Sequence, residues 1–147
     1  MRVFIAGIMQ GSHRDTGIDA QDYRHEITII LQRHVPGIEV LDPFALHPDS
    51  VTYGPDQAKQ TLLELATLAG RADALIAYAP SASMGTAIEI WNAYQNGVPV
   101  YTISPLVKNW VISSLSTLVF PDIAAFEAFV VGGGLSSLAL DRDMSFD

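Results

Sequence analysis

DALIAYAPSASMGTAIEIWNAYQNGVPVYTIS, residues 73–104, is the stretch that decides the fold, because it holds two short apolar runs around one helical segment. The runs 73–80 and 98–104 are continuously apolar, as strands buried on both faces of a sheet are. The segment 85–96 between them ends at Gly97, a residue type that commonly terminates helices. A strand, a helix and a second strand in this order indicate a β-α-β unit, in which the two strands run parallel.

The same alternation continues in both directions along the chain. Strand-like runs and helical segments follow one another as strand 2–7, helix 20–34, strand 38–43 and helix 57–70, and after residue 104 as strand 117–120 and helix 122–131. We therefore predict a single doubly wound, flavodoxin- or Rossmann-like α/β domain over residues 1–131, with a parallel sheet of about five strands and helices on both faces. Residues 132–147 are rich in Gly and Ser, and we expect a flexible or partner-docked tail there.

The composition excludes several classes of protein. The 147 residues suit one domain, and 16 acidic against 8 basic residues give a net charge of −8, which argues against a nucleic-acid partner. No apolar run is long enough to cross a membrane, and no secretory signal is visible. Because there is no cysteine, disulfides and thiolate chemistry are excluded, and we expect a cytoplasmic protein. The four histidines lack metal-ligand spacing, so we expect neither a metal site nor a cofactor.

Ligands of such folds bind beyond the carboxyl ends of the strands, where this chain has three polar loops, 7–17, 42–50 and 79–85. The first loop carries neither the dinucleotide fingerprint nor a P-loop. It is either a flexible surface connection or an anion-binding loop, whose glycines let backbone amides approach a phosphate. The loop residues that we expect to contact substrate are Gly7, Gly11, Ser12, Arg14, Phe44, His47, Ser83 and Gly85.

Glu89 is the only charged residue of the helical segment 85–96. Gly85 and Ala93, four residues before and after it, leave space on its face of the helix. A solvated helical Glu more often has a Lys or Arg three or four residues away, and none is present here. The residues alone leave two interpretations open, an ordinary solvated side chain and a reactive carboxylate at the strand-end crevice.

The stretch SMGTAIEIWNAYQNGVPVY (83–101), which follows RADALIAYAPSA (71–82), resembles the signature of the nucleoside 2-deoxyribosyltransferase superfamily. VFIAG (3–7), with its glycine-bearing loop, is similar to the first strand and loop of that superfamily. The resemblance implies that Glu89 is a nucleophile, which attacks the anomeric carbon of a sugar and forms a glycosyl-enzyme intermediate. A general acid must also protonate the departing base.

Two positions depart from the superfamily pattern, and a third distinguishes between two branches of the superfamily. An Asp of the acid or base-binding site is expected eight residues before the Asp that opens the third strand, but Leu65 stands there, so Glu64 and Asp42 are the catalytic candidates. The first-strand aromatic residue is matched only by Phe4, which has no hydroxyl. Six residues before the nucleophile, relatives acting on free nucleosides usually carry Asp, whereas those that hydrolyse nucleoside 5′-monophosphates carry Ser. Ser83 stands there, and its hydroxyl can donate to a phosphate that a carboxylate would repel.

The resemblance therefore favours an N-glycosidase of nucleoside or deoxynucleoside 5′-monophosphates that releases the free base. The alternatives are a deoxyribosyltransferase that exchanges bases on free deoxynucleosides and a non-catalytic nucleotide sensor. Segment 109–120, NWVISSLSTLVF, resembles the region through which one subunit contributes to the site of its neighbour. It implies a homodimer or higher homo-oligomer with a shared active site, in which Ser113 or Ser114 reaches the substrate phosphate of the partner subunit.

Overall fold

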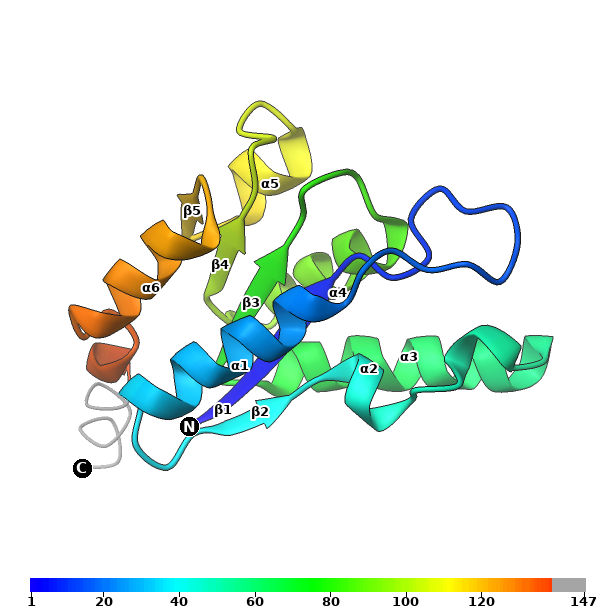
Figure 1. The fold of residues 1–147 in the computed structure, drawn as a ribbon, viewed down its shortest axis with the longest axis horizontal. Helices are drawn as coiled ribbons and strands as arrows, with labels where there is room; N and C mark the ends of the chain where they lie inside the picture. Colours follow the sequence, from blue (N-terminus) through cyan, green and yellow to red (C-terminus); the bar gives the residue numbers. More distant parts are fainter. Residues whose placement is uncertain (139–147) are drawn as a thin grey trace.

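The computed structural model describes residues 1–138 (Figure 1). The strands are β1 (Arg2–Gly7), β2 (Glu39–Leu41), β3 (Ala74–Tyr78), β4 (Val100–Ile103) and β5 (Leu118–Phe120). The helices are α1 (Asp22–His34), α2 (Pro43–Leu46), α3 (Pro55–Arg71), α4 (Met84–Gln95), α5 (Trp110–Leu115) and α6 (Ile123–Val131), with a 3-10 turn at Ser50–Thr52. The sequence predicts all of the strands, but it predicts neither α2, nor the 3-10 turn, nor α5.

The strands form one parallel sheet in the order β2-β1-β3-β4-β5, as predicted for a doubly wound domain. The chain passes from β1 to β2 on one side and then crosses back over β1 to reach β3. The direction of winding therefore reverses between β1 and β3, where Gly7 pairs with Tyr78 at the carboxyl ends of the strands. In open α/β sheets a ligand-binding crevice lies at such a reversal.

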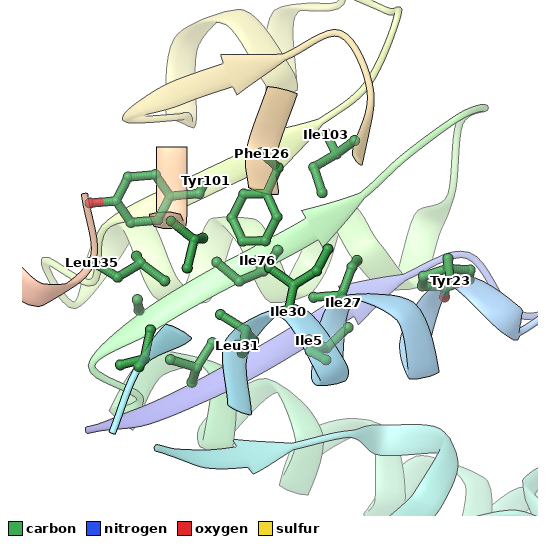
Figure 2. Packing of buried hydrophobic residues seen from close by; sticks show 14 of the residues in the cluster. Ile5, Tyr23, Ile27, Ile30, Leu31, Ile76, Tyr101, Ile103, Phe126 and Leu135 are labelled. Carbon is green, nitrogen blue, oxygen red and sulfur yellow. The ribbon is translucent and has the colours of Figure 1, made fainter. Parts of the chain in front are cut away.

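Helices cover both faces of the sheet (Figure 1). On the face of α1 and α6, Ile5, Ile27 and Phe126 belong to one fully buried core (Figure 2). On the face of α3 and α4 a second core includes Phe4 and Ile90. Successive side chains of a strand point to opposite faces, so β1 serves both cores. Phe4, the aromatic residue of the first strand, is thus fully enclosed in the second core.

The segment after α6 begins as part of the packed domain. Leu135 is fully buried in the core shared by α1 and α6. The ring of Phe129 covers Gly134, where an added Cβ would lie 2.2 Å from a ring carbon. The first residues of the expected tail therefore pack against the domain, and its part beyond residue 138 lies outside the described residues.

Candidate active site

The ring of Tyr23, the second residue of α1, lies at the carboxyl ends of β1 and β3. This ring stacks on Tyr78 with 4.3 Å between the centroids, and its hydroxyl donates to the carbonyl of Ile8 over 3.0 Å. Burial raises the pKa of Tyr23, so the hydroxyl is a neutral donor. A Cβ at position 7 would lie 2.2 Å from the hydroxyl oxygen, so the ring approaches this closely only because Gly7 has no side chain. Gly7 thus has a packing role, and its contact with substrate stays a prediction.

Arg24, the next residue of α1, supplies hydrogen-bond donors to the end of β1, where β2 is too short to supply them. β2 pairs with β1 only as far as Phe4 and Leu41. The carbonyls of Ile5 and Gly7 lie beyond that last pair, so no N–H group of β2 donates to them. The Arg24 guanidinium donates to both carbonyls, over 3.2 and 3.1 Å. A buried carbonyl without a partner is costly, so these two bonds fix the guanidinium at the end of β1.

Asp42 follows β2 directly and binds the same guanidinium. Its Oδ1 lies 3.0 Å from Nη1 of Arg24 and also accepts from the backbone N–H of Phe44 over 3.0 Å, which caps α2. The side chains of Arg24 and Asp42 are 3% and 17% exposed, so this is a largely buried ion pair. A buried cation requires such a partner. The carboxylate that we predicted as a possible general acid is therefore already engaged, and its catalytic role stays a prediction.

Glu89 lies on α4 within electrostatic reach of Arg24 and Tyr23. The residue is only 8% exposed, so the interpretation as a solvated helix side chain is wrong. Its carboxylate has no hydrogen-bond or ion-pair partner among the described residues. Because no side-chain polar atom of those residues is both fully enclosed and unpartnered, the carboxylate oxygens reach open space. Burial raises the pKa of Glu89 to about 8, and the charge of Arg24 opposes this rise.

A cavity of about 370 Å³ opens between the starts of α4 and α5. Its polar lining includes Gly11 and Ser12 of the first loop and Ser83, the N-cap of α4. The structure thus brings these three predicted substrate-binding residues together. The wall formed by α4 and α5 is largely apolar and includes Ile90. Glu89 is not one of the lining residues, although Ile90, the next residue of α4, is.

The hydroxyl group of Ser83 acts only as an acceptor within the described part of the chain, so its O–H can donate to a ligand. Its Oγ accepts from the backbone N–H of Thr86 over 3.3 Å and from the Thr86 hydroxyl over 3.0 Å. A Ser hydroxyl has two acceptor positions and one donor, so the O–H remains free to donate to a ligand. The N–H groups of Met84 and Gly85, in the first turn of α4, have no intrahelical acceptor and carry the positive end of the helix dipole. The start of α4 therefore suits an anionic group.

Other predicted residues lie near this crevice or form a group of their own. Gly85 has open space where a Cβ would be, as expected for the position one turn before Glu89. Arg14 is exposed on the first loop and does not line the cavity. The structure brings His47 and Glu64 together, with 3.8 Å between Nε2 and Oε2, while Nδ1 of His47 lies 3.0 Å from the Tyr53 hydroxyl.

The remaining predicted residues lie apart from the cavity. Phe44 lines a separate hollow of about 460 Å³, together with Arg24 and Asp42. Ser113 and Ser114 are exposed on α5, and Ser114 faces a hollow beside the residues that precede β4, at the opposite end of the sheet. They do not reach the cavity of their own chain, so a contact with substrate has to come from a second copy.

Residues 1–138 contain neither a cluster of metal ligands nor a membrane-spanning helix. No group of three or more His, Asp or Glu side chains in this range is arranged to hold a metal ion. None of its helices is both long and apolar enough to cross a membrane.

Tyr23, Arg24 and Tyr78 are three residues near the ends of β1 and β3 that were not predicted from the sequence as part of the site. A signal for Arg24 is nevertheless present, because it shares a helix face with Ile27 and Leu31, three and seven residues later. A charged residue on the apolar face of an amphipathic helix must find a buried partner, and that requirement marks it for attention.

The sequence matches no protein-family model and no curated protein, but its fold matches solved structures. The 2-deoxyribosyltransferase of Bacillus psychrosaccharolyticus is 19% identical over 86% of this chain and 90% of its own, with a TM-score of 0.65. A conserved protein from Enterococcus faecalis V583 is 16% identical over 88% of this chain and 96% of its own, with a TM-score of 0.63. The CMP N-glycosidase BcmB of Clostridium botulinum is 20% identical over 87% and 96%, with a TM-score of 0.52.

The chain therefore has a doubly wound α/β fold that it shares with a 2-deoxyribosyltransferase and a CMP N-glycosidase. The fold implied by the resemblance to the nucleoside 2-deoxyribosyltransferase superfamily is confirmed. Since one fold can serve several activities, the activity has to be argued from the site.

Proposed function

We propose that the chain is an enzyme of the nucleoside 2-deoxyribosyltransferase superfamily that hydrolyses the N-glycosidic bond of a nucleoside or deoxynucleoside 5′-monophosphate. The observation that carries this proposal is Glu89, a buried carboxylate without a partner, on the helix α4 that forms one wall of a cavity. Structural carboxylates that are buried are normally paired, so an unpaired and accessible one suits a group that reacts with a ligand. The shared fold with a CMP N-glycosidase supports the same activity.

In the proposed reaction the ionised carboxylate of Glu89 attacks the anomeric carbon. One carboxylate oxygen bonds to that carbon as the bond to the base nitrogen breaks, and the electron pair leaves with the base, which takes up a proton. A water molecule then attacks the same carbon, loses a proton, and returns Glu89 as a carboxylate with release of the sugar 5-phosphate. The transition states carry positive charge on the sugar, which a nearby carboxylate stabilises.

The phosphate end of the substrate is assigned to Ser83 and the start of α4. The free O–H of Ser83 and the N–H groups of the first turn of α4 are donors for a phosphate. Ser12 and Gly11 line the same cavity from the first loop. Two charge-assisted hydrogen bonds, each worth roughly 1.5–3 kcal/mol, would favour a 5′-monophosphate over its nucleoside by about 100-fold or more.

Glu64 is the better candidate for protonating the base. Leu65, which stands in place of the expected Asp, is an apolar residue that packs against the core shared by α3 and α4, so it cannot donate a proton. Glu64 is 55% exposed, lies within 4 Å of His47, and can exchange its proton with solvent. Asp42 is less suited, because its carboxylate holds Arg24 and caps α2.

A second candidate function is base exchange on free deoxynucleosides, favoured by the TM-score of 0.65 to a 2-deoxyribosyltransferase. In that reaction a second base, in place of water, attacks the glycosyl-enzyme intermediate. The two activities share Glu89 and differ in the acceptor, and at the 5′ position they differ in whether a phosphate or a hydroxyl is bound.

The proposal includes a homodimer or higher homo-oligomer. The outer surface of α4 and α5 exposes large apolar side chains, with Met84 at 83% and Trp110 at 86% exposure. Ile88 and Trp91, one and two turns after Met84 on α4, are also exposed. An apolar surface of this kind is typical of an interface. Ser113 and Ser114 belong to the same helix as Trp110, so this interface would bring them to a neighbouring subunit.

The test is incubation with paired nucleoside 5′-monophosphates and nucleosides, each with and without a second base, followed by chromatography of the products. Release of free base from a monophosphate without an acceptor is the expected result. Product formation only with a second base would favour the transferase, and no turnover of any substrate would favour the nucleotide sensor.

Glu89→Gln keeps the shape of the side chain and removes the nucleophile, so activity should fall by several orders of magnitude. Glu26→Gln, an exposed substitution on α1, is the matched control. Near-normal activity of Glu89→Gln would overturn the covalent mechanism.

A further inference from the structure

We propose that His13 and Asp19 form a hydrogen-bonded pair, which we call the clasp, that holds Gly11 and Ser12 in place to bind the phosphate of a substrate. The inference rests on the proposed function, which assigns the phosphate end of the substrate to the cavity that Gly11 and Ser12 line. His13 and Asp19 lie on the loop between β1 and α1 and do not line that cavity themselves. Both are therefore positioning residues of the anion site.

Gly11 and Ser12 are the two central residues of a tight turn. The backbone N–H of His13 donates to the carbonyl of Gln10 over 3.0 Å, which closes the turn. Gly11 has a φ of +55°, in the left-handed region that glycine adopts without steric cost. Gly11 and Ser12 line the cavity, whereas Gln10 and His13 do not. The residues that can contact a ligand are thus the centre of the turn, and their positions depend on how its ends are held.

Asp19 contacts the turn from the far end of the loop. Its Oδ1 lies 3.0 Å from Nε2 of His13, the last residue of the turn. Its Oδ2 packs against Gly11, where an added Cβ would lie 2.9 Å from that oxygen. Its backbone N–H donates to the carbonyl of Met9 over 2.7 Å, directly before the turn. One residue therefore makes contacts before the turn, at its centre and at its end.

The base of the loop is anchored to the start of α1, so that Asp19 has a fixed position. The side-chain amide of Gln21, which precedes α1, donates to the carbonyls of Ile8 and Asp19 over 3.0 and 2.7 Å. Among the hydrogen bonds of residues 1–138, the contact between His13 and Asp19 is the one that joins residues 10–13 to the rest of the chain. The clasp thus orders the turn before a ligand arrives, which spares the ligand the entropic cost of ordering it.

A positioning role and a purely electrostatic role predict opposite effects of Asp19 on anion binding. A carboxylate beside the turn repels a phosphate, so by charge alone the loss of Asp19 should strengthen anion binding. If Asp19 positions the turn, its loss should weaken anion binding, because the ligand must then order the turn. The side chains of His13 and Asp19 are each 40% exposed, and ion pairs this exposed contribute little to stability. Substitutions of the clasp should therefore leave the fold intact.

The experiment measures the binding of inorganic phosphate to the wild type and to variants of the loop. Phosphate is titrated into 15N-labelled protein, and the NMR shifts of the Gly11 and Ser12 amides are followed. Asp19→Ala and His13→Ala should each weaken binding by roughly three- to fivefold, equivalent to at most about 1 kcal/mol. Asp19→Asn keeps an oxygen that can accept from Nε2 of His13, so it should bind phosphate at least as well as the wild type. Asp22→Ala, which removes an exposed acid at the start of α1, is the matched control for charge and should not weaken binding.

Two further measurements separate a clasp from independent effects of the two side chains. The double variant His13→Ala/Asp19→Ala should bind phosphate no more weakly than either single variant, because all three lose the same contact. The 15N order parameters of Gly11 and Ser12 should fall in both alanine variants and stay unchanged in Asp22→Ala. Equal or tighter phosphate binding by Asp19→Ala would overturn the proposal, and so would a wild type that does not bind phosphate.

The catalytic assay shows which of the two proposals fails. On the nucleotide identified above, the alanine variants should raise KM and leave kcat largely unchanged, because the clasp does not touch the reacting atoms. If phosphate binding followed the expected order among the variants but no nucleotide were hydrolysed, the proposed function would fail and the clasp would stand. If nucleotides were hydrolysed but the alanine variants bound phosphate like the wild type, the clasp alone would fail.

Discussion

Replacing Glu89 by Gln should make the folded protein less sensitive to alkaline pH. The pKa of Glu89 is about 8 in the fold against an ordinary value of 4.5, so the folded state favours the protonated acid. The contribution of Glu89 to the free energy of unfolding is therefore highest below pH 4.5, falls as the pH rises towards 8, and is constant above it. A separation of about 3.5 pH units corresponds to at most about 5 kcal/mol. Since many domains are stable by only 5–15 kcal/mol, an effect of even half this size is measurable.

The assay is urea unfolding of wild type, Glu89→Gln and the exposed control Glu26→Gln at pH 5 and pH 9. Gln cannot ionise, so Glu89→Gln should gain stability relative to wild type by several kcal/mol between the two values of pH. Glu26→Gln should follow the wild type. If Glu89→Gln and wild type lost stability in parallel, the carboxylate of Glu89 would have to be solvated, contrary to its described burial.

Three further outcomes are expected. Ser83→Asp keeps an N-cap for α4 but replaces a donor by a charge, so the ratio of kcat/KM for a 5′-monophosphate over its nucleoside should fall by about 100-fold; equal wild-type constants would refute the phosphate assignment. Gly7→Ala should cost about 1–3 kcal/mol by displacing Tyr23, whereas Gly85→Ala, with open space around it, should be neutral or slightly stabilising in the same urea titration. Light scattering at micromolar concentration should give at least a dimer mass, and Trp110→Lys should lower it; a monomeric wild type would contradict the proposed interface.

The sequence predicted the sheet because its strands are buried on both faces and read as continuous apolar runs. The run around β3 and β4 also places the loop before α4 at the carboxyl ends of the strands. Glu89 could be singled out because it is the only charged side chain of α4. Ser83 as an N-cap and the cavity it shares with Ser12 follow from the same arrangement.

The rest of the site depends on contacts that no local pattern contains. The role of Arg24 arises because β2 ends at Leu41, earlier than the predicted strand 38–43, and leaves carbonyls of β1 unpaired. The packing of Tyr23 over Gly7 joins residues 16 positions apart in the chain. α5 was missed because its residues, WVISSL, are weak helix formers. The side chain of Asn109 accepts from two N–H groups at its start and supports the helix.

The early end of β2 has a consequence for how this fold varies between related chains. In a related chain, a second strand about four residues longer would supply N–H groups to the carbonyls of Ile5 and Gly7 and would occupy the place of the guanidinium. Strand length and a basic residue at the start of the first helix are therefore alternatives. In an alignment of homologues we expect the two to covary, with an insertion after the second strand accompanied by loss of the arginine. A gap of this kind at the edge of the sheet would mark which lineages hold a buried cation at the end of the first strand and which do not.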